Sequence, residues 1–197
     1  MIAKALQAAC RDIREPVPDD MTARFVIGLG LPDAMRTLAP GLAAHRHSEL
    51  AAHYRHHYLA QEDDIPLFDG AAELLAELLR AGYLLAVATG KTRAGLDRAL
   101  KKNGLATHFH ATRCADEGHP KPHPDMLLHL MERLSVPAED TLMIGDTTHD
   151  LELARNAGTS AVAVLYGAHT TEGLAKWAPL AMVSSVAEMR TWLEGNG

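Results

Sequence analysis

Cysteine and aromatic residues are scarce in this 197-residue sequence, and no long apolar run occurs. Its two cysteines, Cys10 and Cys114, are too few for a disulfide framework and suit a reducing compartment. A transmembrane span needs about 18 consecutive apolar residues, and no such run is present. The opening segment MIAKALQAACRDIRE lacks the apolar stretch of a secretory signal. We therefore expect a cytoplasmic protein with no membrane partner.

Basic residues are outnumbered by acidic ones, 19 to 25, which gives a formal charge of −6. A net negative field repels nucleic-acid phosphates and anionic lipid, so nucleic acid is not an expected partner. Hydrophobic residues make up 47% and charged residues 22%, which is typical of a globular protein and excludes disorder.

The two parts of the sequence differ in their hydrophobic pattern. Residues 1–65 show helical periodicity and no convincing strand, whereas residues 66–197 alternate short apolar segments with amphipathic ones. Strands are expected at 83–89, 109–112, 141–144, 160–164 and 181–183. Helices are expected before, between and after these strands, at 70–81, 92–103, 124–134, 150–156 and 186–193. This alternation predicts an α/β fold with a doubly wound parallel sheet, in which strand 83–89 is buried. Such sheets bind ligands beyond the carboxyl ends of their strands.

The first strand end carries Thr89-Gly90-Lys91-Thr92. Gly-Lys-Thr between a strand and a helix suggests a nucleotide-binding P-loop, but that motif needs a glycine where Leu85 stands. The alternative is a hydroxyl and a helix N-terminal amide that together hold one phosphoryl group. Thr89 as a plain helix cap is the competing structural interpretation.

Two later segments add charge at the same edge. Lys121 lies in the stiff segment HPKPHPD, where it could neutralise a phosphate or a carboxylate cluster. After the strand at 141–144 comes Gly145-Asp146-Thr147-Thr148-His149-Asp150. Two carboxylates with few other ligands suit Mg²⁺, although both aspartates could instead stabilise a helix N-terminus.

In this order and strand context, Thr89, Lys121 and the Gly145–Asp150 loop resemble the haloacid dehalogenase-like hydrolases, and most closely their phosphoglycolate-phosphatase-like branch. The resemblance implies a Rossmann-like core over 66–197 and a small α-helical cap over 1–65. It also implies a phosphatase that acts on a small phosphorylated metabolite.

The family resemblance also implies the roles of individual residues. Thr89, Lys121 and Asp146 are the expected catalytic residues. Thr89, Gly90 and Lys121 would hold the transferring phosphoryl group, and Asp146 and Asp150 would bind Mg²⁺.

One motif of the family has no counterpart in this sequence. Family members begin with a strand that ends in Asp-x-Asp, which holds the nucleophile and the general acid/base, and no Asp-x-Asp occurs here. Asp69 is rejected as a substitute because Pro66 precedes it and a helix follows at once. The resemblance implies that this chain opens after the first core strand, roughly fifteen residues into the family's pattern.

The absent strand would lie between strands 83–88 and 141–145 in the family's sheet. We expect those two strands either to close on each other or to leave edges that make the chain dimerise, swap strands or lose stability. Without a nucleophile the chain is expected to be inactive as a phosphatase. The alternatives are a non-catalytic protein that binds phosphate or a partner on the same scaffold, and a P-loop-like nucleotide binder.

Twelve histidines are many for this length, and His53, His56 and His57 share one helical face. Histidines at i and i+4 can share a transition-metal ion. No cysteine lies near them, so a solvated helix face is the preferred interpretation.

Overall fold

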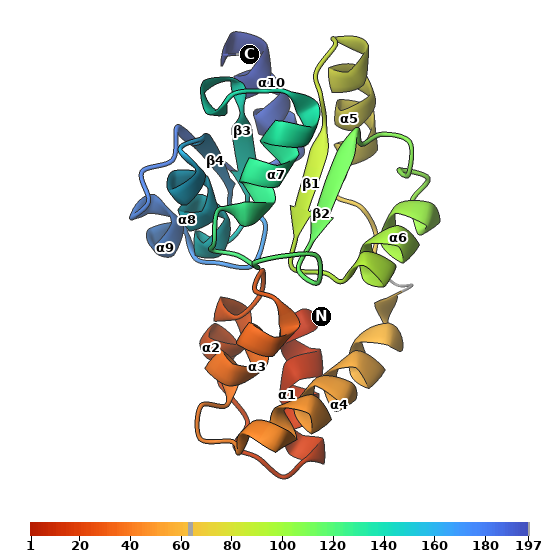
Figure 1. The fold of residues 1–197 in the computed structure, drawn as a ribbon, viewed down its shortest axis with the longest axis vertical. Helices are drawn as coiled ribbons and strands as arrows, with labels where there is room; N and C mark the ends of the chain where they lie inside the picture. The colour runs from red at the N-terminus through yellow and green to blue at the C-terminus, as the bar shows by residue number, and fades with distance from the viewer. Residues whose placement is uncertain (63–64, 197) are drawn as a thin grey trace. The chain divides into compact units, whose positions relative to one another are not determined.

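The structure is a computed structural model that describes residues 1–62 and 65–196 (Figure 1). The chain divides into two compact units, Met1–Pro66 and Leu67–Gly197. No helix in the described parts of the chain combines the length and the apolar character needed to cross a bilayer. That the first unit acts as a substrate-selecting cap stays a prediction.

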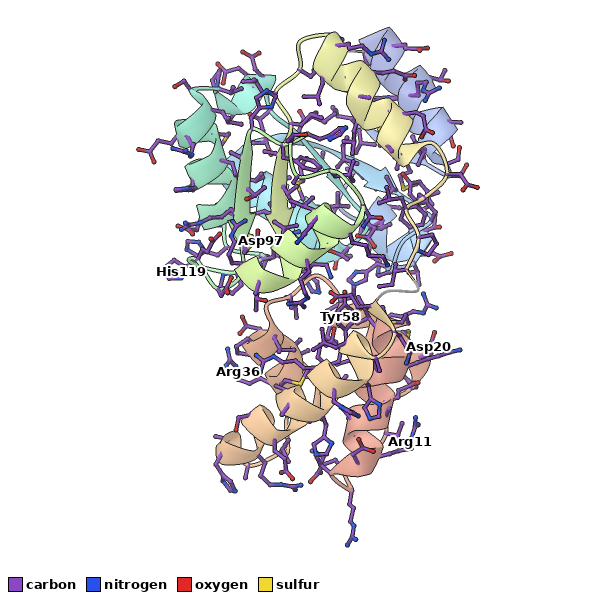
Figure 2. All side chains as sticks on the ribbon, turned by 90° about the vertical axis from the view of Figure 1, so that its right-hand side faces the viewer. Arg11, Asp20, Arg36, Tyr58, Asp97 and His119 are labelled. Atoms are coloured by element: carbon purple, nitrogen blue, oxygen red, sulfur yellow. The ribbon has the colours of Figure 1, made fainter. Side chains whose placement is uncertain are left out.

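The regular elements of the first unit, among its described residues, are all helices. Its helices are α1 (Ile2–Asp12), α2 (Asp20–Phe25), α3 (Leu31–Leu38) and α4 (His47–Leu59), with the 3₁₀ turn η1 (Ala44–Arg46) before α4. Leu6, Met35 and Leu50, one from each of three helices, are at most 2% exposed and form the centre of its apolar core. Arg11, Asp20 and Arg36 lie on its outside (Figure 2). The apolar stripes of the sequence therefore face one another and leave the charges in water.

The second unit alternates strands and helices, as predicted. Its helices are α5 (Ala71–Arg80), α6 (Arg93–Lys102), α7 (Asp125–Leu134), α8 (Thr148–Ala157), α9 (Thr171–Ala175) and α10 (Val186–Asn196), with the 3₁₀ turn η3 (Ala138–Asp140). Its strands are β1 (Ala86–Thr89), β2 (Ala111–Cys114), β3 (Leu142–Gly145), β4 (Ser160–Val164) and β5 (Ala181–Val183). Every strand pair is parallel, which confirms the α/β fold class.

The strands form two sheets, β1-β2 and β3-β4-β5. β1 pairs with β2 from Ala86 opposite Ala111 to Thr89 opposite Cys114. In the described residues β1 and β3 do not pair, so the first of the two expected alternatives, that these strands close on each other, is wrong, and the second stays a prediction. Helix α7 contributes the physical reason, because its buried core cluster has apolar side chains of both β1 and β3 packed against it. A helix is about twice as wide as the spacing of paired strands, so one helix can cover both sheets while they stay apart.

Strand β4 shows why both faces of its sheet are covered. Val162 and Val164 pack in one cluster with Leu74 of α5 and Met189 of α10. The alternate residue Ala163 packs with Leu151 of α8 and Leu174 of α9. Successive side chains of a strand point to opposite faces, so this apolar run needs helices on both sides.

Strand β1 is shorter and more exposed than the sequence predicts. It begins at Ala86 rather than at residue 83, and no residue of it is fully buried. Tyr83 and Leu84 are 40% and 48% exposed. Hydrophobic periodicity cannot report this, because the burial of a strand depends on its neighbours. β1 has β2 on one side and, among residues 1–62 and 65–196, no strand on the other.

Candidate active site

Two loops that are distant in sequence meet at the carboxyl end of β3. The ammonium nitrogen of Lys121, in the loop before α7, donates to Oδ1 of Asp150 in the first turn of α8 at 2.5 Å. The side chains of both residues are almost fully buried, 6% and 5% exposed. The pairing explains how a lysine can be buried, since an isolated buried ammonium would be strongly unfavourable. Lys121 is therefore not a solvated loop lysine.

The second oxygen of Asp150 is also engaged. Oδ2 accepts hydrogen bonds from the amide and the hydroxyl of Thr147, at 3.0 and 2.7 Å. Thr147 in turn accepts from the amide of Asp150, which completes a capping box at the start of α8. Burial acts to raise the pKa of Asp150, but Lys121 and Thr147 outweigh burial and lower it. Asp150 thus serves both as a helix cap and as the anion that orients Lys121, and its role as a metal ligand stays a prediction.

Gly145 lets Asp150 come this close to the end of β3. A Cβ atom at Gly145 would overlap the side chain of Asp150. The turn from β3 into α8 therefore requires a residue without a side chain at this point.

Asp146 lies beside this pair. Its Oδ2 accepts from the amide of Ala168 at 2.8 Å. Burial, together with the negative charge of Asp150, raises the pKa of Asp146, while Lys121 acts in the opposite direction. A carboxylate held in such surroundings favours a cation next to it.

The segment that follows β4 holds Asp146, although no residue of this segment was predicted to belong to the site. A Cβ atom at Gly167 would overlap the Asp146 side chain, the amide of Ala168 donates to that side chain, and the amide of His169 donates to the Asp146 carbonyl at 3.2 Å. The ring of His169 also accepts from the amide of Thr148 at 3.0 Å and stacks edge-on with His149. Gly167, shortly after the buried strand β4, is the feature of the sequence that could have pointed to this segment, because this fold binds ligands at its strand ends.

Thr89 and Gly90 end β1, in the other sheet. The Thr89 hydroxyl accepts from the amide of Lys91 at 3.1 Å, and Thr92, not Thr89, caps α6 by accepting from Gly95. Among the described residues no hydrogen bond joins Thr89 to Lys121 or Asp146. The structure therefore brings Lys121, Asp146 and Asp150 together, and it leaves Thr89 and Gly90 at a separate strand end.

The histidine face lies in the first unit. His53 Nδ1 and His57 Nε2 both contact Oδ2 of Asp12, at 3.1 and 2.6 Å. No group of three or more His, Cys, Asp or Glu side chains in residues 1–62 and 65–196 is arranged to hold a metal ion. Cys10 and Cys114 are both buried free thiols, and burial raises the pKa of each.

The sequence profile of the haloacid dehalogenase-like hydrolases matches residues 1–164. Among curated relatives, the probable phosphatase IndB of Dickeya dadantii is 38% identical over 95% of this chain and 84% of its own length. The pyrophosphatase PpaX of Listeria monocytogenes is 29% identical over 96% of this chain and 87% of its own. Among solved structures, a predicted phosphoglycolate phosphatase from Haemophilus somnus superposes with a TM-score of 0.84 at 20% identity, over 98% of this chain and 90% of that one.

Proposed function

Because this chain belongs to the haloacid dehalogenase-like hydrolase family, we propose that it carries the phosphoryl-binding and metal-binding groups of a Mg²⁺-dependent phosphatase for a small phosphorylated metabolite. The observation that carries the proposal is the buried pair of Lys121 and Asp150 next to Asp146. Phosphatases among the relatives support the reaction class.

Each group has a distinct task in this proposal. The ammonium of Lys121 neutralises the phosphoryl oxygens, and the Thr89 hydroxyl and the Gly90 amide donate hydrogen bonds to them. Phosphoryl transfer spreads negative charge over these oxygens in the transition state, so fixed donors stabilise it. Asp150 keeps Lys121 in place, since both of its oxygens are already bonded within the protein.

Asp146 fits the metal role. Its Oδ2 accepts from the Ala168 amide, and burial beside Asp150 leaves its negative charge only partly balanced by Lys121. A hard carboxylate oxygen suits Mg²⁺, which keeps several waters and takes few protein ligands. Bound there, the ion would supply further positive charge to the phosphoryl group.

The attacking carboxylate is not among these 197 residues, which contain no Asp-x-Asp. β1 and β3 each have a strand on one side only within the described residues, and Ile144 of β3 is 42% exposed. These two half-paired strands support placing a nucleophile-bearing strand between them. We expect the 197-residue polypeptide to bind phosphate and not to turn over.

The test compares hydrolysis of phosphate monoesters by two polypeptides, with and without Mg²⁺. One is the 197-residue chain, and the other is the same chain preceded by a strand that ends in Asp-x-Asp. We expect activity only in the second, lost in Lys121→Ala and kept in the exposed control Lys176→Ala. Backbone amides of β1 and β3 should also exchange hydrogen more slowly once the strand is added.

Other outcomes select other functions. Hydrolysis by the 197-residue chain at an ordinary enzymatic rate, unchanged by Lys121→Ala, would show that the site is misplaced. Phosphate binding that needs Lys121, with no hydrolysis by either polypeptide, would favour the non-catalytic phosphate binder. Nucleotide binding without any hydrolysis would favour the nucleotide binder.

A further inference from the structure

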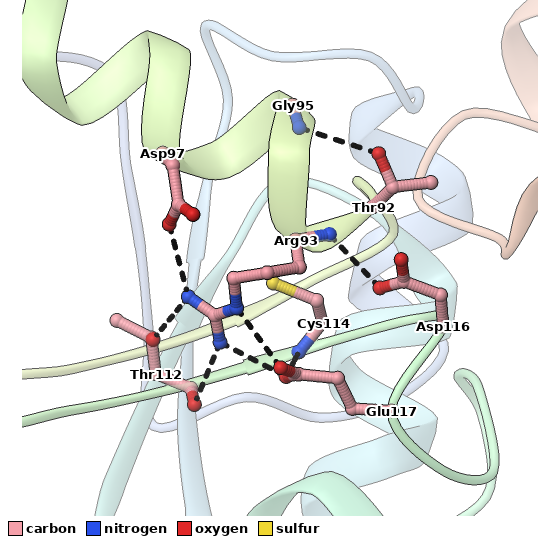
Figure 3. A network of polar contacts seen from close by, with 8 residues as sticks. All are labelled: Thr92, Arg93, Gly95, Asp97, Thr112, Cys114, Asp116 and Glu117. Atoms are coloured by element: carbon pink, nitrogen blue, oxygen red, sulfur yellow. Dashed lines mark hydrogen bonds and ion pairs between the residues drawn. The ribbon is translucent and has the colours of Figure 1, made fainter.

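The guanidinium of Arg93, the first residue of α6, uses all of its donors (Figure 3). Nε and Nη2 donate to the two carboxylate oxygens of Glu117, each at 2.9 Å. Nη1 donates to the Thr112 hydroxyl at 2.8 Å and to Asp97 at 3.3 Å, and Nη2 reaches the Thr112 carbonyl at 3.3 Å. Five hydrogen bonds are the full capacity of an arginine.

Hydrogen bonds from backbone amides join the same two segments, around Arg93 and around Glu117. The amide of Arg93 donates to Asp116 Oδ1 at 2.9 Å, and the amide of Ala115 donates to the Lys91 carbonyl at 3.0 Å. Glu117 Oε2 also accepts from the amide of Cys114 at 2.8 Å. Residues 91–93 are thus joined to residues 112–117 by main chain and side chains together.

Each joined segment leads to a group of the proposed site. Residues 91–93 directly follow Thr89 and Gly90, and residues 112–117 open the loop that reaches Lys121. Thr89 and Cys114 are also direct neighbours in the β1–β2 register. A shift of one segment would therefore move one phosphoryl-binding group relative to the other.

We propose that the Arg93–Glu117 pair is a positioning device that fixes the Thr89–Gly90 turn relative to the Lys121 loop. The inference rests on the proposed function, since it assigns the pair to phosphoryl binding at those groups. The donors of Arg93 are all used within the protein, so the pair would act on the phosphoryl group through the loops that it joins.

The geometry favours a positioning role over a purely stabilising one. The side chains of Arg93 and Glu117 are 34% and 29% exposed, so solvent screens part of the attraction between their charges. A two-point carboxylate contact, by contrast, fixes orientation as well as distance. Lysine keeps the charge of arginine but lacks its planar fork of donors, so it cannot reproduce the two-point contact with Glu117.

The experiment is a titration of the 197-residue chain with inorganic phosphate in the presence of Mg²⁺, followed by ³¹P NMR. Arg93→Lys and Glu117→Gln should each weaken phosphate binding about tenfold, the lower end of what loss of a supporting partner costs a site. Arg80→Lys, at an exposed arginine of α5, is the matched control and should bind as the parent does. All titrations are run well below the unfolding temperature of each variant, with circular dichroism confirming the native helix content.

A double-mutant cycle separates positioning from general destabilisation. If Arg93 acts through the Thr89 turn, Arg93→Lys should cost much less affinity in a Thr89→Ala background than in the parent. An undiminished loss in that background would overturn the inference. The inference would also be overturned if Thr89→Ala weakened phosphate binding and Arg93→Lys did not. That result would leave the proposed function intact. Phosphate binding indifferent to both Thr89→Ala and Lys121→Ala would overturn the proposed function and this inference with it.

Discussion

Lys121 and Asp150 are 29 residues apart in the sequence, yet the ammonium of one lies 2.5 Å from the carboxylate of the other inside the protein. Both charges are almost fully removed from solvent, so each is stable in the folded protein because the other compensates it. The pair also joins the loop before α7 to the first turn of α8. One contact therefore serves the stability of the fold and the geometry of the proposed site.

Asp150→Asn should destabilise the protein by about 3–5 kcal/mol, because it removes the carboxylate that is hydrogen-bonded to the buried Lys121 ammonium. Urea unfolding at neutral pH measures this. Asp20→Asn removes a partner of Arg24 from an exposed helical pair and should cost less than about 1 kcal/mol. Equal losses in the two variants would mean that the buried pair contributes no more than a surface pair.

The Lys121–Asp150 pair also makes the free energy of unfolding depend on pH. The pKa of Asp150 is lowered in the folded state, so its contribution is complete above the unfolded value of about 3.9 and is lost as the pH falls through the folded value. The difference in unfolding free energy between the parent and Asp150→Asn should therefore shrink steadily below about pH 4. A difference that stays constant down to the lowest pH at which both proteins fold would contradict this.

Gly167→Ala should weaken Mg²⁺ and phosphate binding together, by about tenfold or more, because the new methyl group displaces the Asp146 carboxylate. Isothermal titration with Mg²⁺ in the presence of phosphate measures the loss. Gly41→Ala is the matched control, since a Cβ atom there meets nothing within 4 Å. Unchanged affinity in Gly167→Ala would show that the segment after β4 does not hold Asp146 in its binding position.

Mg²⁺ binding to the 197-residue chain alone should be weak, because Asp146 and Asp150 are the two carboxylates proposed for it and both oxygens of Asp150 are already bonded within the protein. Each carboxylate missing from a site leaves more of the ion's charge unbalanced. Direct titration should show no stoichiometric binding, and Asp146→Ala should abolish what remains. Tight equimolar binding would contradict the assignment of both residues.

Glu117 provides a second reason for the stability of the protein to depend on pH. The hydrogen bonds from Arg93 lower the pKa of Glu117 to about 2, although burial acts against them. Its stabilisation is present above the unfolded value of about 4.3 and is lost as the pH falls toward 2. The stability gap between the parent and Glu117→Gln, about 1 kcal/mol at neutral pH, should close over this range, whereas Glu132→Gln, at an exposed glutamate, should show no such gap.

The order of strands and helices and the positions of the proposed site residues could be predicted from the sequence. Both depend on local features, namely apolar periodicity and the glycine and proline residues that end each element. Thr89, Lys121, Asp146 and Asp150 could be singled out because parallel strands end at one edge of a sheet. Local patterns suffice for these statements.

Which groups contact one another depends on tertiary packing. Burial of β1 depends on what lies beside it, so an apolar run predicted as a buried strand is half-exposed. Lys121 lies in a loop whose composition is typical of solvent exposure. Its ion pair with Asp150 explains how its charge can be buried.

The contacts that arrange the proposed site join distant segments and have no local signature. Asp146 is held by the segment that follows β4, and Arg93 is bonded to Glu117 across two loops. Such contacts exist only once helices have packed the strands into place. The kinds of chemical groups and the strand ends that carry them follow from local sequence patterns, whereas the packing of the chain sets their partners.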